Sequence, residues 1–335
     1  MKAKALVGML SLLALGIGGV GCGDGEDGPV TVYSGREEEL VAPLYEIYEE
    51  ETGNELEVRY GDSAELAATI LEEGDNTPAD VFFSQDAGAL GALEKDGAFA
   101  VLDVALVAEV DPRYRSADGR WVGTSGRARV VAYDSRELTE SELPGSVLDL
   151  TGDEWEGRIG WAPTNGSFQA FVTALRLSEG EGAARKWLEA MEANGTEAFD
   201  GNSSIRDAIA AGEIDAGLIN HYYVAQAREE EGEDYPVEVY FPPGGDVGSL
   251  VNVAGAGVLE ASPRQEAATE LVEFLLSPRA QRYFAEETKE YPLAAGVAAD
   301  PGVVPLAEIE QPRVDLSNLD DLQGTLDLLE EAGAL

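Results

Sequence analysis

The side chains with the most distinctive chemistry are two adjacent tyrosines, Tyr222 and Tyr223, which follow a strand-like run at residues 216–220. A phenol loses its proton near pH 10 in water, but a bound, highly charged cation can displace that proton at neutral pH. Neighbours on a strand point to opposite faces, so two phenols converge only where the strand turns into a helix. A tyrosine pair taken alone is more often an ordinary aromatic contact, so its meaning depends on the surrounding elements.

Other reactive groups are scarce. The chain has one cysteine, Cys22, and one histidine, His221. This excludes zinc-finger and iron–sulfur sites, which need several thiolates. No GxSxG elbow, phosphate-binding GxxxxGK[ST] loop or GxGxxG after a strand occurs. With 65 acidic residues, no single carboxylate pair is informative. We therefore expect a binding protein and not an enzyme.

Alternating strands and helices position these residues. Residues 30–34, 55–60 and 79–83 are strand-like, and helical periodicity covers 37–52, 64–73 and 87–95. This rhythm predicts a parallel sheet flanked by helices, with ligands at the carboxyl ends of its strands.

A second set of elements follows without a separating linker. Strands are predicted at 128–133, 158–162, 216–220 and 251–256, and helices at 168–177, 183–194, 205–211 and 263–276. Two α/β units joined in this way suggest lobes that exchange chain through more than one crossing.

The N-terminus reads as an export signal. Lys2 and Lys4 precede an apolar, glycine-rich run that is short for a membrane span and ends at Cys22. Cys22 resembles a bacterial lipobox cysteine, although Gly19 stands where Leu is usual. We expect a signal peptide at 1–21 and a flexible tether at 22–28, giving a periplasmic or cell-surface protein anchored by lipid at Cys22. The alternative is an N-terminal membrane anchor or a buried helix.

The formal net charge is −43, and it becomes more negative when the signal leaves with its two lysines. Nucleic acids and anionic lipid headgroups both require Lys and Arg for neutralisation, so neither is an expected partner. Solubility, as in a saline habitat, is the simplest explanation of the acidic excess. We expect a monomer whose only membrane contact is its lipid.

Seven stretches resemble, in order, the ferric-iron substrate-binding proteins of bacterial ABC transporters, over residues 30–293. They are VYSGREEE, EETGNELEVRYGDSAELAATILEEGDNTPADVFFSQDAGALGAL, SGRARVVAY, APTNGSFQAF, FDGNSSIRDAIAAGEIDAGLINHYY, LVNVAGAGVL and EFLLSPRAQRYFAEETKEYPL. The resemblance implies a two-lobed, Venus-flytrap α/β fold, each lobe a mixed sheet flanked by helices. We place the first lobe at 29–127 and 253–302, and the second at 128–252 and 303–335. The implied function is capture of Fe³⁺ with a synergistic phosphate or carbonate, for delivery to an ABC permease.

The resemblance also implies metal ligands. Tyr222 and Tyr223 occupy the family's two tyrosine positions, and Fe³⁺, a small hard ion, favours anionic oxygen. The usual first-lobe histidine is replaced by Glu37, an oxygen donor that is alternatively one member of a solvated acidic run at a helix start. The usual acidic ligand is replaced by Gln85, with Asp86 beside it, and we expect Gln85 to orient water or anion. His221 is expected to support the site without binding metal.

On the anion side, the resemblance points to the loop Asn165, Gly166 and Ser167 at a predicted helix start, where backbone N–H groups favour anions. Asn202 and Asn220 occupy its two amide positions, and Arg127 is the expected guanidinium. Ser167 is alternatively an ordinary helix cap. Arg129 is expected to pair within the acidic surface.

Two alternatives remain open. The same fold binds other solutes, such as sulfate, phosphonate, putrescine or thiamine, but such sites have no need of adjacent tyrosines. A surface sensor or adhesion protein built on the same trap is the other.

Overall fold

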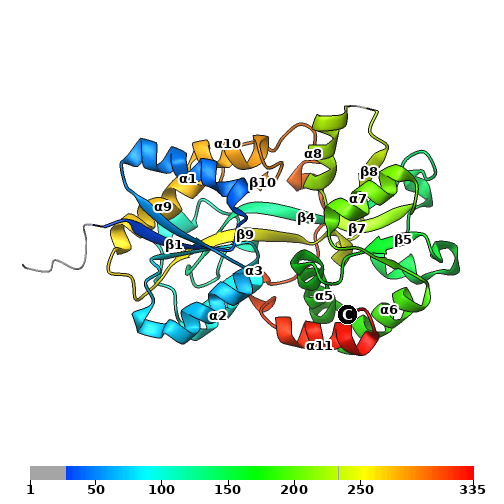
Figure 1. The fold of residues 1–335 in the computed structure, drawn as a ribbon, viewed down its shortest axis with the longest axis horizontal. Coiled ribbons are helices and arrows are strands. Elements are labelled where there is room, and N and C mark those ends of the chain that lie inside the picture. Colours follow the sequence, from blue (N-terminus) through cyan, green and yellow to red (C-terminus); the bar gives the residue numbers. More distant parts are fainter. Residues whose placement is uncertain (1–27, 233) are drawn as a thin grey trace, which may run out of the picture.

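The computed structural model describes residues 28–232 and 234–335. The predicted signal peptide, Cys22 and the predicted tether up to residue 27 lie outside the described residues. Within the described part, the chain is an α/β protein with two lobes side by side (Figure 1). No helix of that part is long and apolar enough to cross a membrane.

The first lobe is built on three parallel strands, β1 (Val30–Ser34), β2 (Leu56–Tyr60) and β3 (Val81–Ser84), with β1 in the middle. The fourth strand, β9 (Val251–Val258), pairs antiparallel with β3, so the sheet is mixed. Its helices are α1 (Glu38–Thr52), α2 (Ser63–Glu73), α3 (Ala87–Asp96), the short α4 (Val104–Val107), α9 (Gln265–Leu276) and α10 (Pro278–Glu286). The first six predicted elements are confirmed to within two residues at each end.

The second lobe repeats this plan. Its strands are β5 (Ile159–Trp161), β6 (Glu197–Ala198), β7 (Ala216–Asn220) and β8 (Val237–Tyr240), of which β5 runs parallel to β6 and β7. Its helices are α5 (Gly166–Glu179), α6 (Glu181–Ala193), α7 (Asn202–Ala211), α8 (Tyr222–Glu231) and α11 (Leu322–Ala332). Together the two lobes confirm the predicted two-lobed fold with mixed sheets.

One long strand, β4 (Val122–Asp134), joins the lobes. Residues 122–128 of β4 pair with β9, whereas residues 129–134 pair with β7 and β8. A short strand, β10 (Tyr291–Pro292), pairs with the first half of β4. Arg127 and Arg129 thus flank the point where the strand leaves one sheet and enters the other. The residue boundaries predicted for the lobes stay a prediction.

An aromatic cluster supports the start of α5. Phe168 packs edge-on against Trp161, with ring centroids 5.5 Å apart, and lies 5.6 Å from Phe171. Trp187 of α6 closes the group at 5.7 Å from Phe171. All four side chains are buried. Because burial of such large rings contributes about 2 kcal/mol or more each, the first turn of α5 is held firmly in place.

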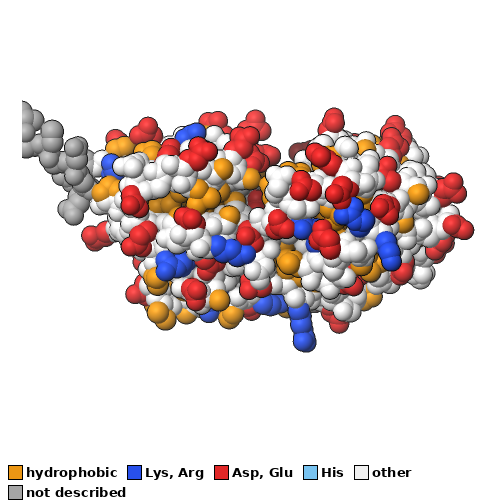
Figure 2. Space-filling model, turned by 90° about the horizontal axis from the view of Figure 1, so that it is seen from below, with side chains coloured by type: hydrophobic (Ala, Val, Ile, Leu, Met, Phe, Trp, Pro, Cys, Tyr) orange, Lys and Arg blue, Asp and Glu red, His pale blue; other side chains and the backbone are white. Residues whose placement is uncertain are grey.

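The surface is strongly acidic. Asp and Glu side chains are spread over both lobes in the view of Figure 2, with fewer Lys and Arg among them. The negative charge is therefore distributed over this face and not gathered into one patch.

Candidate metal and anion site

A cleft of about 420 Å³ lies between the lobes. Eleven sequence-predicted residues line it: Glu37, Gln85, Asp86, Arg127, Asn165, Gly166, Ser167, Asn202, Asn220, Tyr222 and Tyr223. The first lobe contributes from the carboxyl ends of β1, β2 and β3, and the second lobe from the starts of α5, α7 and α8. The structure thus brings every predicted metal and anion residue to one cleft. His221, which was expected to support the site without binding metal, is buried outside the cleft lining.

The two tyrosines converge because the chain changes from strand to helix directly after β7, just before Tyr222. Asn220 ends β7, His221 has helical backbone angles (φ −57°, ψ −40°), and α8 begins at Tyr222. The rings of Tyr222 and Tyr223 stack with centroids 4.3 Å apart and planes 27° apart. The strand-to-helix turn expected from the sequence is therefore present.

Tyr222 is the more buried phenol, with 5% of its surface exposed. Burial and the neighbouring Tyr223 raise the pKa of Tyr222 well above its ordinary value of 10, while the charge of Arg127 opposes the rise. In the protein without a bound cation, Tyr222 is consequently protonated at neutral pH. A cation that binds this oxygen must displace the proton.

His221, which directly precedes the tyrosines, is held by hydrogen bonds at both ring nitrogens. Its Nδ1 accepts the Ala128 N–H at 3.1 Å, and its Nε2 lies 3.1 Å from the carbonyl oxygen of Lys289. Since Nδ1 is an acceptor, Nε2 carries the proton and donates it to that oxygen. Burial lowers the pKa of His221 to about 4, so the ring is neutral at physiological pH. With both ring nitrogens occupied, His221 has no free nitrogen to offer a metal.

The second lobe presents an amide and hydroxyl surface at the start of α5. Asn165 caps this helix by accepting the Ser167 N–H at 3.1 Å. The alternative interpretation, in which Ser167 is the helix cap, is therefore wrong. The Asn202 amide donates to Asn165 Oδ1 at 3.3 Å and to Ser167 Oγ at 3.4 Å. Short polar side chains followed by helix-forming residues produce such caps locally.

Arg129 corrects a sequence prediction. We expected it to pair with surface carboxylates, but it is 2% exposed, and no ion pair forms at Arg129 within the described residues. Instead it donates to Ser167 Oγ (3.2 Å), Asn202 Oδ1 (3.3 Å), Asn220 Oδ1 (3.4 Å) and Leu218 O (2.6 Å). The sequence could not reveal this because the partner atoms come from three separate elements.

Arg129 also shapes the electrostatics of the second lobe. Burial lowers its pKa to about 9, while the two phenols oppose that fall. At neutral pH it remains a buried positive charge next to the loop formed by Asn165, Gly166 and Ser167.

Arg127 lines the cleft and forms no ion pair within the part of the chain that the structure describes. Its side chain is 4% exposed, and its Nε has no hydrogen-bond partner in the described part of the chain. A buried donor without a partner costs about 1–3 kcal/mol, so a guanidinium on the wall of a cleft is well suited to an anionic ligand.

The first lobe offers fewer fixed ligands. Glu37 stands before α1, is exposed and caps no backbone N–H. Gln85 Oε1 is buried without a partner. Asp86 instead caps α3 by accepting the Gly88 and Ala89 N–H groups at 2.9 and 3.2 Å, and burial raises its pKa. Asp86 is thus already engaged as a helix cap.

Sequence reasoning missed Tyr60, which ends β2 and lines the same cleft. Burial and the nearby charge of Glu38 raise its pKa above 10. The signal was available, because the carboxyl end of a parallel strand is where ligands bind. No three His, Cys, Asp or Glu side chains converge on a metal position among residues 28–232 and 234–335. Among the described residues, the phenols of Tyr60, Tyr222 and Tyr223 line this cleft.

Known proteins share this architecture. The family model described as bacterial extracellular solute-binding protein matches residues 76–318. The Fe(3+)-binding periplasmic protein of Serratia marcescens is 34% identical over 333 residues, covering 99% of this chain and 97% of that protein. The chain belongs to the bacterial extracellular solute-binding proteins.

Solved structures agree with this membership. Iron-bound HitA from Pseudomonas aeruginosa superposes with a TM-score of 0.85 at 32% identity, covering 91% of this chain and 99% of that one. The Trichodesmium protein IdiA (FutA), in complex with iron and citrate, gives a TM-score of 0.80 at 29% identity over 91% and 99% of the two chains. As an extracellular solute-binding protein, this chain has its cleft at the junction of the two lobes, and both lobes contribute to its walls.

Proposed function

We propose that this protein captures Fe³⁺ together with an anion and delivers it to an ABC permease. The observation that carries the proposal is the stacked phenol pair of Tyr222 and Tyr223. It lines a cleft shared with the guanidinium of Arg127, whose Nε has no hydrogen-bond partner among the described residues. Two phenolates and one anion supply negative oxygen atoms, which a small trivalent ion favours over nitrogen or sulfur. The names of the Serratia and Pseudomonas proteins support the same cargo.

The anion is a phosphate or a carbonate, held from the second lobe. Its partners are the N–H groups at the start of α5, the hydroxyl of Ser167, the amides of Asn202 and Asn220, and Arg127. Arg129 acts through Asn202 and Asn220, whose side-chain oxygen atoms accept its N–H groups, so that both amides are held in place at the wall of the cleft. Citrate, present with iron in the Trichodesmium complex, is the polycarboxylate that belongs in the same test.

The first lobe completes the metal shell. Glu37 is a free carboxylate at the cleft, and Tyr60 is a third phenol on the same wall. Gln85 orients water through its buried amide oxygen, which has no partner among the described residues, or orients the anion through its amide N–H groups. Cargo that contacts both lobes stabilises the closed arrangement over an open one, so capture proceeds as a shift in population.

Delivery of iron to the permease requires that the exported protein stay close to the membrane. The predicted lipid on Cys22 keeps the protein at the membrane, and the acidic 22–28 tether lets its body reach the permease. Acid or reduction to Fe²⁺ favours release, because protons compete for the phenol oxygen atoms and the softer ion is held less well.

Iron titration by absorbance tests the proposal. Fe³⁺ added with phosphate, carbonate or citrate should produce the visible tyrosinate-to-iron charge-transfer band and raise the melting temperature. Tyr222→Phe and Tyr223→Phe should each weaken or shift the band, and Tyr133→Phe, in β4 but outside the cleft lining, should leave it unchanged. A parent protein that stays colourless and gains no thermal stability would exclude ferric capture, and the same fold would then serve another solute.

A further inference from the structure

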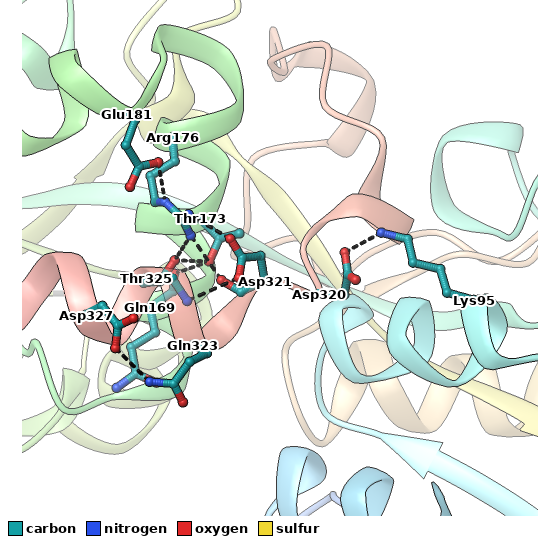
Figure 3. Close-up of polar contacts among 11 residues, drawn as sticks. Lys95, Gln169, Thr173, Arg176, Glu181, Asp320, Asp321, Gln323, Thr325 and Asp327 are labelled. Carbon is teal, nitrogen blue, oxygen red and sulfur yellow. Dashed lines mark hydrogen bonds and ion pairs between the residues drawn. The ribbon is translucent and has the colours of Figure 1, made fainter.

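Among the elements that line the cleft, the starts of α3 and α5 lie in opposite lobes. α3 begins directly after Gln85 and Asp86 of the first lobe, and α5 begins directly after Asn165 of the second. The far halves of these helices carry Lys95 on α3 and Arg176 on α5. Residues 316–325, which we call the strap, contact both helices (Figure 3).

The strap is fixed to the first lobe through α3. Asp320 Oδ1 pairs with Lys95 Nζ at 2.6 Å, and Ser317 Oγ donates to Glu94 at 3.0 Å. Its backbone also lies directly on two glycines of α3. A Cβ on Gly88 would come within 2.5 Å of the Leu319 carbonyl oxygen, and one on Gly91 would overlap the Ser317 carbonyl. The contact is therefore a close backbone-to-helix fit as well as an ion pair.

The next residue fixes the strap to the second lobe. Asp321 Oδ2 pairs with Arg176 Nη2 at 2.7 Å, and Arg176 Nη1 donates to the Asp321 carbonyl at 3.0 Å and to Thr325 Oγ1 at 2.9 Å. The hydroxyls of Thr325 and Thr173 lie 2.7 Å apart, so α11 is joined to α5 over more than a turn. In Figure 3, Asp320 points toward Lys95 while Asp321 points toward Arg176.

The strap also borders the space between the lobes. A gap of about 260 Å³ between α2, α3 and α5 is lined by Leu319 and Leu322 of the strap. The same gap shares Asp62, Asp86 and Gly166 with the cleft. The strap thus borders a space that is continuous in its lining with the cleft.

We propose that Asp320 and Asp321 are positioning residues that set the spacing between the two halves of the binding site, through the helices α3 and α5. Neither residue touches the cargo. The ion pairs of the strap favour the arrangement in which both lobes line one cleft. Their loss widens the distribution of lobe separations. The effect on iron affinity rests on the proposed function, whereas the effect on lobe separation does not depend on the identity of the cargo.

The test uses a charge exchange in which each single variant changes the net charge by two units and the double variant restores the net charge of the parent. Asp320→Lys places two cations face to face, Lys95→Glu places two anions face to face, and the double variant restores an ion pair of reversed sense. Glu331→Gln is the matched control, since Glu331 of α11 pairs with Arg185 inside the second lobe. Spin labels at Glu72→Cys on α2 and Glu189→Cys on α6, in a Cys22→Ser background, report lobe separation without ligand. Iron affinity is measured by competition with nitrilotriacetate.

Each single exchange should broaden and lengthen the label distance and raise the iron dissociation constant about two- to fivefold, as expected for one partly exposed ion pair. The double variant should return the label distance distribution to that of the parent and the iron dissociation constant to within twofold of the parent. Glu331→Gln should change neither quantity. If Asp320→Lys does not fold, the distance between the same two spin labels is measured in Asp320→Asn instead.

An unchanged distance in the single variants, or no recovery in the double variant, would overturn the proposal. A protein that binds no iron at all would remove the cargo assignment, yet the distance measurement would still decide the role of the strap.

Discussion

The imidazole of His221 lies flat on the ring of Tyr291, with centroids 4.3 Å apart and planes 12° apart. The two residues come from α8's start and from β10, which pairs with β4. The helix that carries the tyrosines is therefore attached to the strand that joins the lobes.

This attachment predicts an acid-sensitive contribution to stability. The pKa of His221 is about 4 in the folded chain and near 6.5 when unfolded, so the unfolded state binds the proton more readily between these values. The stabilisation is complete above pH 6.5 and is lost as pH falls toward 4. Urea unfolding should show a loss of about 1 kcal/mol between pH 7.5 and 5.5 that is missing in His221→Phe. Equal pH slopes in both proteins would contradict the prediction.

Iron affinity should rise with pH. The raised pKa of Tyr222 means that Fe³⁺ must displace its proton, and each proton released gives about a tenfold gain in affinity per pH unit. Competition with a chelator between pH 5 and 7.5, corrected for the protonation of the chelator and anion, measures this slope. Tyr222→Phe should lower the slope by about one proton; an unchanged slope would place the displaced proton elsewhere.

The two buried arginines should separate binding from stability. Arg129→Gln removes donors from four acceptors and should lower the free energy of unfolding by about 2–4 kcal/mol. Arg127→Gln should cost less than about 1 kcal/mol, because its Nε has no partner to lose. It should nevertheless weaken iron binding about tenfold and reduce its dependence on anion concentration. The prediction fails if Arg127→Gln is the more destabilised of the two.

Glu37 is best tested against its neighbour. Both Glu37 and Glu38 are exposed and line the cleft, so the two Glu→Gln variants change local charge equally. If Glu37 is a ligand, Glu37→Gln should raise the iron dissociation constant about tenfold or more, and Glu38→Gln by about twofold. Equal effects would reduce Glu37 to a contribution of charge alone.

A buried ion pair beneath the site should be intolerant of half-removal. Arg36 Nη2 lies 3.0 Å from both oxygens of Glu290, and neither side chain is exposed. Glu290→Gln leaves the guanidinium without its counter-charge and should cost about 3–5 kcal/mol in chemical denaturation. Arg36→Met combined with Glu290→Met should be less destabilised than Glu290→Gln, and a greater loss in the double variant would refute this.

The sequence predicted most of the elements that form the cleft, because strands such as β7 and helices such as α1 carry clear periodicity. It predicted only the second half of β4. The first half, VGTSGR, has no alternation of apolar residues, since every residue in it is buried, and it pairs with β9 on one edge and with β10 on the other. Helices α10 and α11 were also missed, and α8 was expected only as a turn from strand to helix after β7. The helix α8 has only a weak apolar face, because it contacts the rest of the protein mainly through its first turn and a few side chains.

The site itself was predicted by residue type and resemblance, and its connections were not. Arg129 was misplaced because its partners lie 38 to 91 residues away in the chain. The same holds for the strap, whose meaning depends on Gly88 and Gly91 lying under its carbonyl groups. Such contacts follow from tertiary packing, which no local pattern encodes.

Because β4 is hydrogen-bonded in both sheets along a single run of thirteen residues, neither half of the molecule has a complete sheet of its own. Cutting the chain within β4 would expose unpaired backbone groups on both sides. The two lobes are therefore expected to melt in one cooperative transition, and neither should be recoverable as a separately folding fragment.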